Sequence, residues 1–401
     1  MVAGRWSLVA GAKTATTHNL INAMDRRPNI VVIITDQERS HKHWPKGWAE
    51  QNLRVHYDRL IGCSDQSRSS AVFTNAFTAT TECSPSRASL LTSSYPTEHG
   101  VITTPGVLDP ITDRGVSSNE DAIERSLRPN LLRLLSAQHT NSVDTKGYNV
   151  SWKGKWHLNH SNDPNLLNYY GATSPWNPPD AGHSLSVSYT LGGGMKFNHD
   201  GRFLRGTKRR FDVFLKQQQS VDGGLEKTPS DSDESIEETE TESVFDFLSK
   251  QKLDADGNRA QPFCLIASLV NPHDVWASSC FSKLSDEEFY LETGYHPRDF
   301  ESIPIDLPPS RTDDLSSKPS IQSLMSSHPV FGDLSDSNNI DDQQRKSDAL
   351  RYIRFYAYLH KLVDDEIGSL LDELEATGQM ENTIIVRLAD HGELGLSHAM
   401  R

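Results

Sequence analysis

The sequence predicts an α/β domain with a mainly parallel central sheet flanked by helices. Several segments are short, continuous apolar runs, which is typical of strands that are buried on both faces. The last of them follows a long helical pattern, and the order strand, helix, strand is typical of parallel sheets. These two observations predict the fold class.

Four strands are predicted, in the order in which they occur. Residues 29–35 form an unbroken β-branched run that ends at Asp36. Residues 147–152 are a weaker strand, and residues 262–270 and 383–389 are apolar runs. All four have the length of an ordinary strand.

Two helices are predicted between the strands. Residues 128–135 carry Pro129 near their start, where proline is tolerated in a helix. Residues 347–375 form a longer amphipathic helix that Gly378 ends. Its apolar positions at helical spacing are Val363, Ile367, Leu370, Leu371 and Leu374.

Polar segments divide the chain into an extension and a domain with insertions. Residues 217–243 contain nine acidic residues and one Lys and are predicted to be a disordered surface loop. Residues 308–346, rich in Ser, Asp and Pro, and residues 136–145 are two further insertions. Residues 1–26 are predicted to be a disordered N-terminal extension, and residues 27–401 form the domain.

Composition limits the classes of partner. The chain has 401 residues and a net charge of −14, and such a protein repels nucleic acid and anionic membranes. No apolar run approaches the length of a membrane-spanning helix. Four cysteines do not make a disulfide framework. The N-terminal extension has the composition of an import peptide or a tail without a clear signal peptide, so the compartment, the secretory pathway included, is left open.

Polar side chains follow each predicted strand. In open α/β sheets, ligands bind at the carboxyl ends of the strands, so these side chains are expected to share one cleft. Any one of them alone is more often a turn residue or a helix cap. The coincidence at all four strands favours a site. The residues are Asp36, Gln37, Lys155, His157, His273, Asp390 and His391.

A subset of these residues offers ligands for a divalent cation. Asp36 and Asp390 supply hard oxygen ligands. Gln37 can add an amide oxygen, and His391 an imidazole nitrogen. This mixed set accepts Ca²⁺, Mg²⁺ or Mn²⁺, and the nitrogen favours Mn²⁺ slightly.

Residues 83–92 begin with Cys-Ser-Pro-Ser-Arg and predict a helix that starts at a cysteine. Pro85 suits the first turn and Ser84 is a plausible N-cap. Cys83 then lies at a helix N-terminus, where anions are favoured, and Arg87 can point back to the same place. A buried cysteine beside a capped helix is an equally weighted alternative from these residues alone.

Together, these motifs resemble the sulfatases of the alkaline phosphatase superfamily. Residues 83–87 match the C-x-P-x-R signature, in which the cysteine is oxidised to formylglycine. Residues 28–36 resemble the opening strand and first metal ligand, and residues 154–157 resemble the G-K-W-H motif. Residues 271–273 and 390–393 match two further blocks in the same order. The resemblance implies an alkaline phosphatase-like sheet.

Some positions depart from the common arylsulfatase pattern. Gln37 stands in place of a second Asp, and His391 in place of an Asn. Both features look more like choline sulfatases and phosphonate monoester hydrolases. Ser93 stands where the family usually has Gly. The family has a Lys a few residues past the Asp-His-Gly block, followed by a C-terminal subdomain. The sequence stops at Arg401, before this Lys, so the subdomain is expected to be missing.

The resemblance implies hydrolysis of a sulfate ester to an alcohol and inorganic sulfate. The nucleophile would be a hydroxyl of hydrated formylglycine, beside one divalent cation, with Ca²⁺ as the leading candidate and Mn²⁺ or Mg²⁺ as alternatives. The implied metal ligands are Asp36, Gln37, Cys83 as formylglycine, Asp390 and His391. The implied catalytic residues are Cys83, Arg87, Lys155, His157 and His273. Among them, His157 is implied to act as a base on the second hydroxyl.

The implied partners are a small-molecule or carbohydrate sulfate ester and a formylglycine-generating enzyme. Two alternatives stay open at this point. The same site could hydrolyse phosphonate monoesters or phosphodiesters, since all of these substrates are tetrahedral oxyanions. The chain could also be a truncated paralogue without catalytic activity.

Overall fold

A six-stranded sheet forms the centre of the computed structural model, with the strand order β3-β1-β6-β2-β5-β4. The strands are β1 (Ala3–Gly11), β2 (Asn29–Asp36), β3 (Arg68–Phe77), β4 (Asn149–Gly154), β5 (Phe263–Pro272) and β6 (Thr383–Ala389). The structure describes residues 3–11, 27–62, 68–103, 130–136, 147–158, 166–174, 242–251, 261–276, 278, 284–293, 295–327 and 342–401.

The four strands predicted from the sequence are the four parallel strands of this sheet. β2 pairs in parallel with β5 and with β6, and β4 pairs in parallel with β5. β5 is buried along its whole length, in agreement with its unbroken apolar run. The prediction of a mainly parallel sheet is therefore confirmed, and the carboxyl ends of β4, β5, β2 and β6 meet at one edge.

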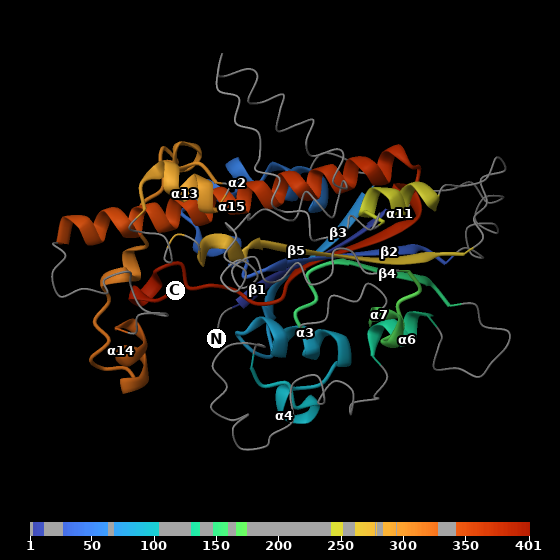
Figure 1. The fold of residues 1–401 in the computed structure, drawn as a ribbon, viewed down its shortest axis with the longest axis horizontal. Coiled ribbons are helices and arrows are strands. Elements are labelled where there is room, and N and C mark those ends of the chain that lie inside the picture. Colours follow the sequence, from blue (N-terminus) through green and yellow to red (C-terminus); the bar gives the residue numbers. More distant parts are fainter. Residues whose placement is uncertain are drawn as a thin grey trace, which may run out of the picture.

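Helices cover both faces of the sheet (Figure 1). α15 (Asp342–Ala376) and α11 (Val244–Lys250) lie on one face, and α3 (Cys83–Thr92), α6 (Leu131–Ser136) and α7 (Leu166–Tyr169) lie on the other. The shorter helices are η1 (His41–His43), α2 (Trp48–Asn52), η2 (Val55–Leu60), α4 (Pro96–His99), η4 (His273–Val275), α13 (Asp286–Thr293), η5 (Pro297–Asp299), η6 (Pro309–Thr312), α14 (Ser320–Ser326), η7 (Met380–Asn382) and η8 (Ser397–Ala399). Among the described helices, none is long and apolar enough to cross a membrane.

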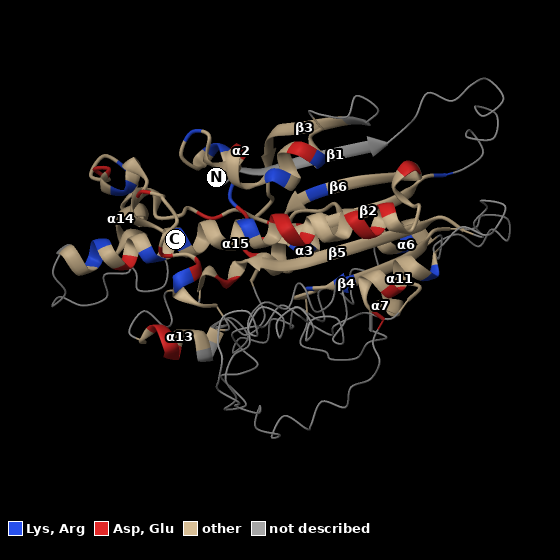
Figure 2. Ribbon diagram, turned by 90° about the horizontal axis from the view of Figure 1, so that it is seen from above, with Lys and Arg blue, Asp and Glu red and all other residues tan. Residues whose placement is uncertain are grey.

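The longest helix, α15, is held by packing. The predicted apolar stripe from Val363 to Leu374 is buried in one core cluster with residues of β2 and β5. Lys and Arg prevail in the first half of α15, and Asp and Glu in the second half (Figure 2). This order is opposite to the one that the helix dipole favours. The buried stripe, rather than the end charges, therefore stabilises the helix.

Three expectations need correction. β1 occupies residues 3–11 of the predicted disordered extension, because antiparallel pairing with β3 and β6 satisfies its backbone groups. The predicted loop 308–346 contains η6 and α14, and α15 already begins at Asp342. The N-cap of α3 is Glu82, because the helix already begins at Cys83, and the Ser84 hydroxyl donates to the His157 carbonyl instead. Residues 136–145 and 217–243 lie almost entirely outside the described residues.

Gly171, which follows α7, lies directly against Arg133 of α6, and its replacement tests this contact. Gly171 has a φ of +108°, and a Cβ there would lie 2.6 Å from the backbone nitrogen of Arg133. We expect Gly171→Ala to lower the free energy of unfolding by about 2–4 kcal/mol, measured by urea denaturation.

The matched control for this substitution is Gly378→Ala. Gly378 has a φ of +69°, but no heavy atom lies within 4 Å of its Cβ position. Only the backbone cost of about 1–2 kcal/mol is then expected. A loss at Gly171 no larger than the loss at Gly378 would contradict the close approach of the two helices.

Candidate active site

Two carboxylates lie side by side at the tips of neighbouring parallel strands. Asp36 is the last residue of β2, and Asp390 follows β6, whose last residue, Ala389, is paired with Thr35. The Asp390 backbone N–H donates to the Thr35 carbonyl at 3.0 Å. The Gln37 backbone N–H donates to Asp390 Oδ1 at 3.2 Å. The register of β2 and β6 therefore brings together residues that are far apart in the sequence.

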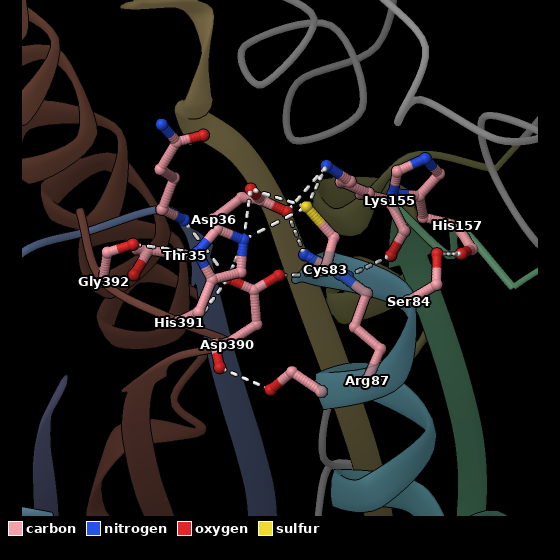
Figure 3. A network of polar contacts seen from close by, with 12 residues as sticks. Thr35, Asp36, Cys83, Ser84, Arg87, Lys155, His157, Asp390, His391 and Gly392 are labelled. Carbon is pink, nitrogen blue, oxygen red and sulfur yellow. Dashed lines mark hydrogen bonds and ion pairs between the residues drawn. The ribbon is translucent and has the colours of Figure 1, made fainter. Parts of the chain in front are cut away.

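Helix α3 places Cys83 against these carboxylates (Figure 3). The Cys83 sulfur lies 3.1 Å from His391 Nε2 and 3.5 Å from Asp36 Oδ1. It also lies 3.7 Å from Lys155 Nζ. Residue 83 is thus surrounded by side chains from three different strand tips.

Arg87 bridges the two carboxylates. Its Nη2 lies 2.9 Å from Asp36 Oδ2, and its Nε lies 2.9 Å from Asp390 Oδ2. Its Nη1 donates to the Lys155 carbonyl at 2.9 Å and to Ser268 Oγ at 2.7 Å. The guanidinium does turn back towards the start of α3, and its role there is to hold the carboxylates.

The turn after β4 contributes Lys155 and His157, the two site residues predicted to follow that strand. Lys155 Nζ lies 2.7 Å from Asp36 Oδ2, and the Lys155 side chain is fully buried. His157 has a φ of +60° and is 4% exposed. The Ser84 hydroxyl of α3 donates to the His157 carbonyl. Both residues are therefore fixed beside α3 (Figure 3).

The buried charged groups of the site shift the pKa values of one another. Burial would raise the pKa of Asp36, but the positive charge of Lys155 outweighs it and holds that pKa well below its usual value. Burial and the charge of Asp36 raise the pKa of Asp390 to about 6. Burial disfavours the charged form of His391, but the carboxylate of Asp390 prevails and raises the pKa of His391 to about 10. At neutral pH the carboxylates are therefore opposed by three cations, one of which is His391.

The turn after β5 contributes His273. Burial and the charge of Lys155 lower the pKa of His273 to about 3, so the ring is neutral at pH 7. His273 Nδ1 is buried and has no hydrogen-bond partner among the described residues. Gln37 is held nearby, because its Oε1 accepts a hydrogen bond of 2.9 Å from the Trp276 indole.

The donor atoms fit a divalent cation. One ligand atom each from Asp36, Cys83, Asp390 and His391 lies within 4.8 Å of the others, and all four residues are buried. Two carboxylates and an imidazole suit Ca²⁺, Mg²⁺ or Mn²⁺. Cation binding at His391 would compete with the proton that this ring carries at neutral pH. Gln37 Oε1 has a second lone pair beside the one that Trp276 uses.

Several residues that hold this site were missed by the sequence analysis. Ser86 and Thr78 both contact the Asp390 carbonyl, and Ser268 contacts Arg87. Two residues after Asp36, Glu38 pairs with Arg387 at 2.7 Å. Serine and threonine are common in any polar sequence, and only the Ser-Pro-Ser spacing around Pro85 could have drawn attention to one of them.

Comparisons with known proteins assign the chain to a family. The sequence model of the family described as Sulfatase matches residues 28–398. The chain is 24% identical over 371 residues to an ulvan-active sulfatase from Formosa agariphila, a match that covers 92% of the chain and 51% of that protein. It is 22% identical over 381 residues to a choline-sulfatase from Rhizobium meliloti, covering 92% of the chain and 58% of that protein. The chain thus spans about half the length of the curated relatives it matches.

Solved structures of other proteins are also similar to this chain, at lower sequence identity. The phosphonate monoester hydrolase of Agrobacterium radiobacter superposes with a TM-score of 0.43 at 17% identity. The match covers 93% of this chain and 64% of that one.

Proposed function

The chain belongs to the sulfatase family, and from this premise we propose that it hydrolyses a sulfate ester to an alcohol and inorganic sulfate. The observation that supports the proposal most directly is the position of residue 83. Its side chain lies at the start of a buried helix, in contact with Asp36, Lys155 and His391. A nucleophile at this position would be placed among cations that attract a sulfate group.

The nucleophile requires Cys83 to be oxidised to formylglycine, which a formylglycine-generating enzyme would do. The hydrated aldehyde carries two hydroxyls on one carbon. One hydroxyl would attack the sulfur as the S–O bond to the alcohol breaks, with its proton passing to the departing oxygen; loss of the proton of the second hydroxyl would then re-form the aldehyde and expel sulfate. His157, which follows β4 beside α3, is our candidate for the base that takes this proton.

The remaining site residues bind and orient the sulfate group. Lys155 is charged and buried, and its ammonium stabilises negative charge that develops on the transferring group. Neutral His273 can donate one hydrogen bond from its ring. Arg87 holds Asp36 and Asp390 in position through its ion pairs. A divalent cation bound by Asp36, Gln37, Asp390 and His391 would act as a Lewis acid at this place.

The substrate is proposed to be a sulfate ester of a small molecule or a carbohydrate. The two curated relatives are named as an ulvan-active sulfatase and a choline-sulfatase. The net charge of −14 disfavours heavily sulfated polyanions.

Two substrates separate sulfatase activity from phosphonate or phosphodiester hydrolysis. We expect the purified protein with Ca²⁺ to hydrolyse an aryl sulfate with a kcat/KM at least about tenfold above that for an aryl phosphonate monoester, a difference of about 1.4 kcal/mol in transition-state binding. The opposite order would assign the site to phosphonate monoesters. The same rates should fall when EDTA removes the cation.

Mass spectrometry of the tryptic peptide that contains residue 83 tests the nucleophile. Protein made in its native host is expected to carry an aldehyde at this position. An intact thiol in all of the protein, together with no turnover of either substrate, would favour a non-catalytic, anion-binding role. Metal analysis of the same sample would identify the cation.

A further inference from the structure

The two serines of the segment Cys83-Ser84-Pro85-Ser86-Arg87 have no part in the chemistry proposed above. Both are nevertheless almost completely buried: Ser84 is 0% exposed and Ser86 is 2% exposed. Buried hydroxyls need partners, because an unpaired polar group in the interior is costly. Each of these hydroxyls bonds to the backbone of a different strand tip.

Ser86 bonds to the tip of β6. Its Oγ donates to the Asp390 carbonyl at 2.5 Å. Thr78 Oγ1 also lies 3.0 Å from this carbonyl, but it is closer to the Thr80 carbonyl, at 2.6 Å. Since a hydroxyl has a single proton, Ser86 is the better donor to Asp390.

Ser84 bonds to the tip of β4. Its Oγ donates to the carbonyl of His157, in the turn that also carries Lys155. In the sheet, β4 and β6 are separated by β5 and β2, so the two serines hold opposite sides of the site. Arg87 contacts the two strands between them, through Ser268 of β5 and Asp36 of β2.

We propose that Ser84 and Ser86 are separate positioning residues, which attach the first turn of α3 to the His157 turn and to the Asp390 turn respectively. The proposal rests on the function proposed above. Ser86 fixes the backbone of Asp390, a proposed metal ligand, relative to residue 83. Ser84 fixes the backbone of His157, the candidate base, relative to the same residue.

Removing the two serine hydroxyls one at a time should change different measured quantities. The Asp390 carboxylate is a cation ligand, and loss of an outer contact to a metal ligand weakens metal affinity by about 10–100-fold. Ser86→Ala is therefore expected to weaken Ca²⁺ binding by about tenfold or more. His157 is not a ligand, so Ser84→Ala should leave the Ca²⁺ affinity within about twofold and lower kcat by about tenfold, within the usual range for a misplaced general base.

The experiment uses the full chain, stripped of metal with EDTA, and titrates CaCl₂ by calorimetry. Turnover of an aryl sulfate is measured separately and divided by the fraction of formylglycine, found by mass spectrometry, because both serines flank the modified residue. Ser89→Ala is the matched control, since Ser89 lies one turn further along α3 and its hydroxyl bonds to Pro85 of the same helix. Ser89→Ala should change neither quantity by more than about twofold, as its hydroxyl contacts no strand tip.

Ser86→Thr keeps a hydroxyl and should bind Ca²⁺ within about twofold of the wild type, which gives a readout even if Ser86→Ala does not fold. Equal losses of Ca²⁺ affinity in Ser84→Ala and Ser86→Ala, or no loss in Ser86→Ala, would overturn the proposal. So would a Ser86→Thr variant that binds Ca²⁺ as weakly as Ser86→Ala. If the wild type itself neither binds Ca²⁺ nor hydrolyses the sulfate, the proposed function fails instead.

Discussion

Replacing Cys83 with Ser is expected to abolish multiple-turnover hydrolysis of an aryl sulfate, with a loss of about 10³-fold or more in kcat. A serine hydroxyl can occupy the same position beside Asp36 and His391. It cannot, however, offer a second hydroxyl on the same carbon, so a sulfate ester formed on it has no route of collapse. Steady-state rates and the intact mass of the protein after reaction measure the two consequences, which are loss of turnover and a covalent sulfate at residue 83.

Cys264→Ala provides the control for this substitution. Cys264 is a second buried thiol, in β5, and burial raises its pKa to about 12, so it is chemically inert. Its replacement should leave kcat within about twofold, because Cys264 is paired with Ile30 and Val150 near the starts of β2 and β4, at the opposite end of these strands from Asp36 and Lys155. If Cys83→Ser kept wild-type multiple turnover, the mechanism through a geminal diol would be wrong.

The strand tips could be predicted because their signals are local. Each parallel strand is a continuous apolar run, and the polar residue that ends the run is visible in the sequence. A parallel sheet then brings these ends to one edge whatever the sequence separation, as for Asp36 and Asp390. The positions of the strand ends and their meeting at one edge could both be predicted without knowing how the segments between the strands fold.

The outer strands could not be predicted in the same way. β1 is a nine-residue segment with Ala and Gly at both ends. β3 begins with Arg and two Ser, and Thr and Asn interrupt its apolar residues. They form because β3 pairs with β1 and β1 pairs with β6, which is a tertiary effect. The N-terminal residues therefore looked like a tail.

The contacts that hold the site were equally hidden. The bond from Ser86 to the Asp390 carbonyl joins residues that are 304 positions apart. Gln37 was identified as a candidate ligand, but its bond to Trp276 follows only from the way the turn after β5 packs. Chemistry is thus visible in residue types, whereas orientation depends on partners that only the fold defines.

Replacing Arg87 with Met should destabilise the metal-free protein more than any surface substitution. Arg87 is 1% exposed and neutralises two buried carboxylates, and removing one partner of a buried ion pair costs about 3–5 kcal/mol. Burial and the charge of Asp36 already raise the pKa of Asp390 to about 6, and without Arg87 this pKa should rise further. Urea denaturation in EDTA measures the free energy of unfolding of both proteins.

The loss should depend on pH and on Ca²⁺ in a defined direction. A carboxyl whose pKa is higher in the folded than in the unfolded protein favours folding while it is protonated, and this contribution is lost as the pH rises through the folded pKa. The stability deficit of Arg87→Met should therefore grow as the pH rises through about 6, the pKa of Asp390 in the folded wild type, and Ca²⁺ should reduce it by replacing the missing positive charge. Arg59→Met is the control, because Arg59 makes only partly exposed ion pairs, with Asp372 and Glu375, and should cost less than about 1 kcal/mol. Equal losses for the two variants would show that Arg87 does not hold the carboxylates together.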